Sequence, residues 1–110
     1  MNKIAGLTNY KQAIIDKVVS LVAGEFSVEE EDLFKKSRAS RYSIPRSVAV
    51  GILRKFYGIQ QQILADYFGY VSHSSVAHAV QSVEKKINIE PELKKIVENI
   101  LYNVKQLEIK

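Results

Sequence analysis

The sequence predicts an all-α domain, a bundle of six helices joined by short connections. Apolar residues recur along most of the chain at the three- and four-residue spacing of amphipathic helices. No segment alternates apolar and polar residues at the period of two that a half-buried strand requires. The 110 residues, 46% of them hydrophobic, are enough for one core, so residues 1–110 are expected to form a single domain.

The first two helices are delimited by capping residues. Thr8 or Asn9 can cap the first, and Gly24 is expected to end it. Ser27 is expected to cap a second, short helix, with Glu30 at capping-box spacing. The acids near its start have the sign that the helix dipole favours, so we assign them a structural and not a catalytic role. The apolar stripe of the first helix consists of Ile14, Ile15, Val18, Val19, Leu21 and Val22.

A polar segment without periodicity, residues 37–43, is expected to form a loop before the third helix. Ser43 would cap that helix, Pro45 would lie in its first turn, and Gly58 would end it. A fourth helix is expected from Gln60 to Phe68, ended by Gly69. The residues of these two helices expected to face the core are Val48, Ile52, Leu53, Phe56, Ile63, Leu64 and Phe68.

The fifth helix is expected from His73 to about Ile87, and a sixth from Pro91 to about residue 107. The fourth and fifth helices, with Gly69 between them, form a candidate helix-turn-helix. In such a motif the second helix enters a DNA groove by its N-terminal end. The expected core residues are Val76, Ala79, Val80, Val83 and Ile87 in the fifth helix and Leu93, Ile96, Val97, Ile100, Leu101 and Val104 in the sixth.

Charge is unevenly distributed along the chain. The 16 basic and 12 acidic residues give a net charge of +4, which permits a polyanionic partner without requiring one. The stretch from Leu33 to Ala65 contains no acid, and it is either an electrostatic footprint for a polyanion or a solvated basic face. Its cations are Lys35, Lys36, Arg38, Arg41, Arg46, Arg54 and Lys55.

Several classes of site lack support in the sequence. There is no cysteine, and therefore no disulfide framework or thiolate metal site. His73 and His78 are five residues apart and do not share the face of a helical zinc pair, so no metal is expected. Neither a phosphate-binding loop nor a GxGxxG run is present, so no nucleotide cofactor and no enzymatic activity are expected. With no membrane-spanning apolar run and no signal peptide, the chain is expected to be cytoplasmic and associated with the nucleoid.

The run GYVSHSSVAHAV, from Gly69 to Val80, opens the fifth helix with short polar side chains. Ser72, His73, Ser74 and Ser75 carry donors and acceptors without bulk, which suits the reading of base edges in a major groove. The alternative is that Ser72 is only the N-cap of an ordinary amphipathic helix.

This run, together with an upstream basic segment, resembles the C-terminal DNA-binding domain of the bacterial replication initiator DnaA family. That family has a tryptophan-repressor-like helical bundle and a run similar to GGRDHTTVxHA at the start of its recognition helix. It also has a basic loop followed by a Pro-Arg pair, which here are residues 36–41 and Pro45 with Arg46. The resemblance covers residues 13–87 and leaves the last helix, residues 91–107, outside it.

The resemblance implies a role for each matching residue. His73 and Ser74 would read base edges, with Ser75 at a third reading position and Ser72 beside them. Arg38 would lie in the minor groove, whose narrow form attracts arginine. Positions expected at the DNA backbone or near it are Lys36, Arg41, Arg46, Arg54 and Tyr70. His78 would have a packing role.

The chain also departs from the family pattern. Val71 and Ser72 replace an Arg-Asp pair, so we expect a changed DNA target. The family's ATPase module has no counterpart here, so the chain is expected to be a stand-alone protein that binds double-stranded DNA and regulates replication or transcription. The alternative is a protein-interaction adaptor that kept the fold but lost base reading. Whether it is a monomer or a dimer stays open.

Overall fold

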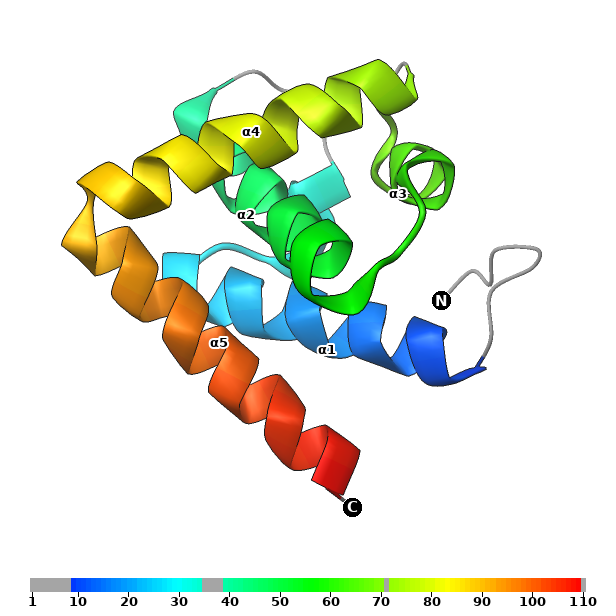
Figure 1. Ribbon diagram of the computed structural model, residues 1–110, viewed down its shortest axis with the longest axis vertical. Coiled ribbons are helices and arrows are strands. Elements are labelled where there is room, and N and C mark those ends of the chain that lie inside the picture. The colour runs from blue at the N-terminus through cyan, green and yellow to red at the C-terminus, as the bar shows by residue number, and fades with distance from the viewer. Residues whose placement is uncertain (1–8, 35–38, 71, 110) are drawn as a thin grey trace.

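The computed structural model describes residues 9–34, 39–70 and 72–109, all of which lie in helices or their connections (Figure 1). The prediction of an all-α fold is confirmed, and this part of the chain contains no strand. All six expected helical segments are present, although the second is a 3₁₀ turn. They are α1 (Asn9–Phe26), η1 (Glu30–Phe34), α2 (Ser40–Tyr57), α3 (Gln61–Phe68), α4 (His73–Ile89) and α5 (Pro91–Ile109).

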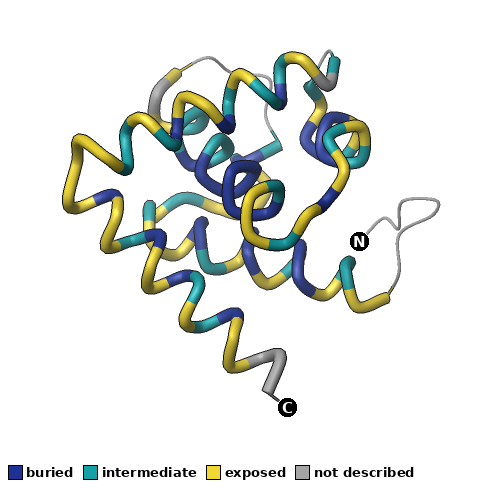
Figure 2. Tube along the Cα trace, in the orientation of Figure 1, coloured by how far each residue is buried: buried dark blue, intermediate teal, exposed yellow. Residues whose placement is uncertain are grey.

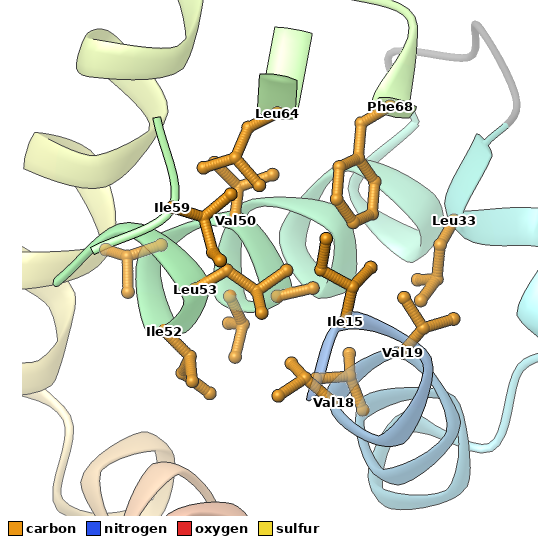
Figure 3. Packing of buried hydrophobic residues seen from close by; sticks show 14 of the residues in the cluster. Ile15, Val18, Val19, Leu33, Val50, Ile52, Leu53, Ile59, Leu64 and Phe68 are labelled. Atoms are coloured by element: carbon orange, nitrogen blue, oxygen red, sulfur yellow. The ribbon is translucent and has the colours of Figure 1, made fainter. Parts of the chain in front are cut away.

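Helix α2 lies at the centre of the bundle. In Figure 1, α4 crosses one side of α2 and α1 lies on the other, while α3 is beside α2 and α5 descends from the end of α4 past the C-terminal end of α1. Figure 2 shows that α2 is the most deeply buried helix in its middle part. Ile15 of α1, Leu53 of α2 and Leu64 of α3 are buried in one apolar cluster, whose side chains gather between these helices (Figure 3).

The end of α1 differs from the prediction. Gly24 lies within the helix, and Ser27 is the residue after it, in the left-handed conformation with φ of 55°. The amide of Ser27 donates to the Gly24 carbonyl and that of Val28 to the Ala23 carbonyl, which is the bonding of a Schellman motif. The expected capping role of Ser27 is therefore wrong. Instead, the Asp32 carboxylate accepts from the Glu29 amide at 3.0 Å and starts η1.

The start of α2 also differs from the prediction. The helix begins at Ser40, three residues before the expected cap, so the second half of the expected loop is helical. The amides of Tyr42 and Ser43 both donate to the Ala39 carbonyl. Pro45 consequently lies inside the helix, where its missing N–H removes one hydrogen bond of the helical ladder.

Two glycines end helices as predicted. Gly58 after α2 and Gly69 after α3 have φ of 63° and 74°, in the left-handed region that glycine adopts without strain. The Gly69 amide and the Tyr70 amide both donate to the Ala65 carbonyl. These bonds close α3 and turn the chain toward α4.

Helices α2 and α4 approach each other closely at a third glycine. A Cβ atom at Gly51 would lie 3.3 Å from a methyl carbon of Val83, tighter than most real Cβ contacts. Both residues are buried, and Val76 and Val80 continue the buried stripe of α4 toward its N-terminus. Gly51 thus lets α4 lie directly on the backbone of α2.

Phe56 is an exception among the predicted core residues. It is 49% exposed, although its spacing from Ile52 places both on one side of α2. The last turn of α2 extends beside an open hollow that Phe56 lines together with Ile87 and Leu101. The helical pattern continues to the end of α2, but the neighbouring helices do not cover it there.

A polar contact joins α1 to α3 beside an aromatic cluster. The Tyr67 hydroxyl donates to the Asp16 carboxylate at 3.3 Å, and the Gln12 amide donates to the same oxygen at 2.9 Å. The Phe34 ring stacks on Phe68, with centroids 5.2 Å apart. Burial, followed by the charge of Asp16, raises the pKa of Tyr67 to about 12.

A side chain at Gly51 should separate α2 from α4. We expect Gly51→Val to lower the free energy of unfolding by about 1–3 kcal/mol because the core there has no room for it. Gly24→Ala is the matched control, since nothing lies within 4 Å of its Cβ position, and it should raise stability by about 0.5–1 kcal/mol. Urea unfolding of both variants measures these changes. An unchanged free energy of unfolding for Gly51→Val would contradict the close packing of α2 and α4 at this position.

Stability should depend on Tyr67 in alkaline solution. Its pKa of about 12 in the folded state exceeds the ordinary value of 10.0, so its contribution is complete below pH 10 and is lost as the pH rises from 10 to 12. We expect Tyr67→Phe to flatten the decline of the free energy of unfolding across this range. The free energy of unfolding of Tyr102→Phe, a change at a 63% exposed position, should decline as steeply as that of the parent protein. Equal slopes for all three proteins would be the contrary result.

Candidate nucleic-acid interface

Helix α4 begins with the cap that the sequence predicts. Ser72 has extended backbone angles, and its hydroxyl accepts from the Ser75 amide at 3.4 Å. The hydroxyls of Ser72 and Ser75 are also within 3.5 Å of each other. Two of the four expected base-reading residues therefore form the cap, while Ser74 is exposed. The side chain of His73 lies outside the described part of the structure.

One face of α4 is uncovered along its length. Opposite the buried stripe, the exposed positions Ser74, His78 and Lys85 follow one another at helical spacing, flanked by Gln81 and Ser82. No acid occurs from His73 to Val83. His78 is exposed, so the packing role expected for it is wrong. Its four-residue spacing from Ser74, on the same face, is the signal in the sequence that indicates this position.

Arg54 and Lys55 of α2 lie along one flank of α4. They line an open hollow with Gln61 of α3 and with Ala77 and Gln81 of α4. The Arg54 guanidinium donates to the Ile59 carbonyl at 3.4 Å, which holds the side chain beside the start of α3.

Lys55 forms an ion pair across the helices. Its ammonium lies 3.7 Å from the Glu84 carboxylate, and both side chains are about half exposed. This pair partly neutralises the acid-free basic stretch from Leu33 to Ala65. Glu84 lies about twenty residues after that stretch, so the charges within the stretch alone do not reveal the pairing.

Ser47 lies on the opposite flank of α4, where it lines a second hollow with Ser82 and Lys86, and Tyr70 lies near Ser47 and Arg46. The Tyr70 ring is half-buried against the core. Burial raises its pKa, against the opposing effects of a hydrogen bond with the Ser47 hydroxyl and of the nearby charge of Arg46. Tyr70 thus packs the turn before α4 against the core, beside Arg46, and the DNA-backbone contact expected for it stays a prediction.

Arg41 lies in the first turn of α2 and not in a loop. It is exposed, and its guanidinium carbon is 5.5 Å from the centre of the Tyr42 ring. A cation at a helix N-terminus opposes the helix dipole, so a bound anion there would remove an unfavourable interaction. Lys36 and Arg38, the other expected residues of this basic segment, lie outside the described residues.

The two arginines of α2 lie on either side of the point where α4 crosses. Arg46 precedes the Gly51 crossing and Arg54 follows it. Eight residues of helix separate them by about 12 Å along the axis at about 1.5 Å per residue.

These features together define a helix-turn-helix protein: α3, a glycine turn, and a capped α4 with an open polar face. The chain belongs to the bacterial DnaA helix-turn-helix family, whose sequence model matches residues 15–83.

Individual relatives agree with this assignment. The chain is 30% identical over 96 residues to the chromosomal replication initiator protein DnaA of Onion yellows phytoplasma, covering 87% of this chain and 19% of that protein. It is 27% identical over 106 residues to DnaA of Treponema denticola, covering 96% and 23%. The chain thus spans about a fifth of the length of these relatives. A crystal structure of a DNA replication initiation factor superposes with a TM-score of 0.73 at 26% identity, covering 86% of this chain and 29% of that one.

Two other kinds of feature are absent from the described ranges. None of the helices there combines the length and apolar character needed to cross a membrane. No group of three or more His, Asp or Glu side chains in these ranges is placed to hold a metal ion.

The cap and the open face of α4 can be separated by substitution. Ser72→Ala should lower the free energy of unfolding by about 1 kcal/mol, because it removes the acceptor for the Ser75 amide. Ser74→Ala, at the exposed neighbouring position, should change it by less than about 0.5 kcal/mol. Denaturant unfolding of the two variants measures both values, and equal losses would show that Ser72 is not the cap.

Proposed function

We propose that this chain binds double-stranded DNA in a sequence-dependent way, with the N-terminal half of α4 in the major groove. The observation that carries the proposal is the uncovered, acid-free face of α4 between two arginines on opposite flanks. Polar side chains of Ser74 and His78 suit hydrogen bonds to base edges, and arginines suit phosphate oxygens.

The positions of these residues indicate which would contact phosphates and which would contact bases. Arg46 and Arg54 would hold the phosphates of the two strands at the edges of the groove, and Arg41 would add a third backbone contact. His73, Ser74 and Ser75 would read bases at the first turn of α4. Phosphate contacts fix the register and base contacts select the sequence, so the two groups of residues should differ in what their loss does.

The biological role that fits best is regulation of DNA replication, in keeping with the replication initiators that the chain resembles over about a fifth of their length. Val71 and Ser72 stand where the family pattern has an Arg-Asp pair, so the proposed target differs from that of the family. The bound duplex is to be found by selection from a random pool.

Substitutions in the protein, tested on the selected duplex, should distinguish residues that contact phosphates from residues that contact bases. Arg46→Gln and Arg54→Gln should each weaken binding to all duplexes and reduce the slope of log affinity against log salt by about one. Ser74→Ala should instead relax the preference at one or two base pairs, by about 1–3 kcal/mol. Fluorescence anisotropy in a salt series measures these effects.

Lys17→Gln is the matched control for charge, because Lys17 is exposed on α1, which lies on the side of α2 away from α4 (Figure 1). It should leave the salt slope unchanged. Binding that shows no dependence on salt, or no duplex recovered from the pool, would refute DNA binding and favour an adaptor role.

A further inference from the structure

A small hollow lies on the flank of α4 opposite Arg54, between α2, α4 and the start of α5. Its volume is about 120 Å³. Val48 and Leu93 contribute apolar lining, and the polar lining comes from Ser43 and Ser47 of α2 and from Ser82 and Lys86 of α4. No acidic residue lines it.

The polar groups of this hollow suit an oxyanion. Lys86 offers three N–H donors and no acceptor, and each serine hydroxyl can donate. Glu84, two residues before Lys86, is paired with Lys55 on the other flank of α4. Lys86 itself makes no ion pair with the described residues, and no carboxylate lies among the residues that line the hollow.

The size of the hollow also fits. A cavity needs only about 10–15 Å³ of space of this kind to hold one water molecule. The hollow, at about 120 Å³, therefore has room for a tetrahedral oxyanion. Ser43, Ser47 and Lys86 are half-buried and Ser82 is exposed, which leaves the hollow open at the side of Ser82. An anion could therefore enter from solvent.

We propose that this hollow binds one phosphate group, either free inorganic phosphate or a phosphate of a nucleic-acid backbone. The Lys86 ammonium and the hydroxyls of Ser43 and Ser82 would donate to its oxygens. Ser47 also lies beside Tyr70, which belongs to the turn before α4. A bound phosphate would thus join α2 to α4 close to the proposed DNA-binding face.

In the first test, ¹⁵N-labelled protein is titrated with sodium phosphate and, separately, with sodium chloride at matched ionic strength. Amide chemical shifts monitor both titrations. We expect saturable shifts at residues 43, 47, 82 and 86 with phosphate only. Lys86→Gln should weaken this binding about tenfold or more, through loss of charge-assisted hydrogen bonds. Lys85→Gln removes the same charge from the exposed neighbouring position and should leave the affinity within about twofold. Thermal unfolding of both variants verifies that they are folded.

The second test identifies a nucleic-acid source. If the phosphate belongs to bound duplex, Lys86→Gln should lower the salt slope of duplex binding by about one, and Lys17→Gln should not. Saturable phosphate shifts with an unchanged slope would support the site with free phosphate as its ligand. Absence of both effects, or shifts equal in the parent and in Lys86→Gln, would overturn the proposal. The first test requires no DNA, so failure of the proposed DNA binding would be seen separately.

Discussion

Gly51 of α2 lies against Val83 of α4, and a Cβ atom there would come within 3.3 Å of a valine methyl. This contact brings α4 onto the backbone of the central helix. With Val83 held against Gly51, the buried stripe of Val76 and Val80 faces the core and the opposite face of α4 is left uncovered. A larger side chain at Gly51 would have to lift α4 or displace it, and interiors packed to the density of organic crystals resist both.

The same crossing sets the composition of the two flanks of α4. Because α4 passes over the middle of α2, one end of α2 supplies Arg46 and Ser47 to one flank and the other end supplies Arg54 and Lys55 to the other. The Tyr70 brace fixes the turn on the first flank, and the Lys55–Glu84 ion pair joins the helices on the second. The open face of α4 and the cations beside it are therefore positioned by the same helix crossing and are not independent features of the surface.

Local signals in the sequence predict much of this arrangement. Gly58 and Gly69 end helices where positive φ is needed, Ser72 caps α4, and Pro91 opens α5, because each effect involves only neighbouring residues. The capping roles predicted for Ser27 and Ser43 are wrong, because the hydrogen bonds that end α1 and begin α2 form at the Ala23, Gly24 and Ala39 carbonyls. The exposure of Phe56 and His78, the Gly51 contact and the Lys55–Glu84 pair depend on how helices distant in sequence meet, which helical periodicity does not specify. All the DNA-contact roles stay predictions, including those of His73, Lys36 and Arg38, whose side chains lie outside the described part of the structure.

In the proposed complex, α4, seated on Gly51, would be held in one major groove by cations on both of its flanks. Ethylation interference on the selected duplex tests it most directly, because it reports which backbone phosphates the protein requires. We predict two groups of essential phosphates, one on each strand, facing each other across a single major groove. Two results would rule out this arrangement. The essential phosphates could lie on one strand only, or they could flank a minor groove with none facing each other across a major groove.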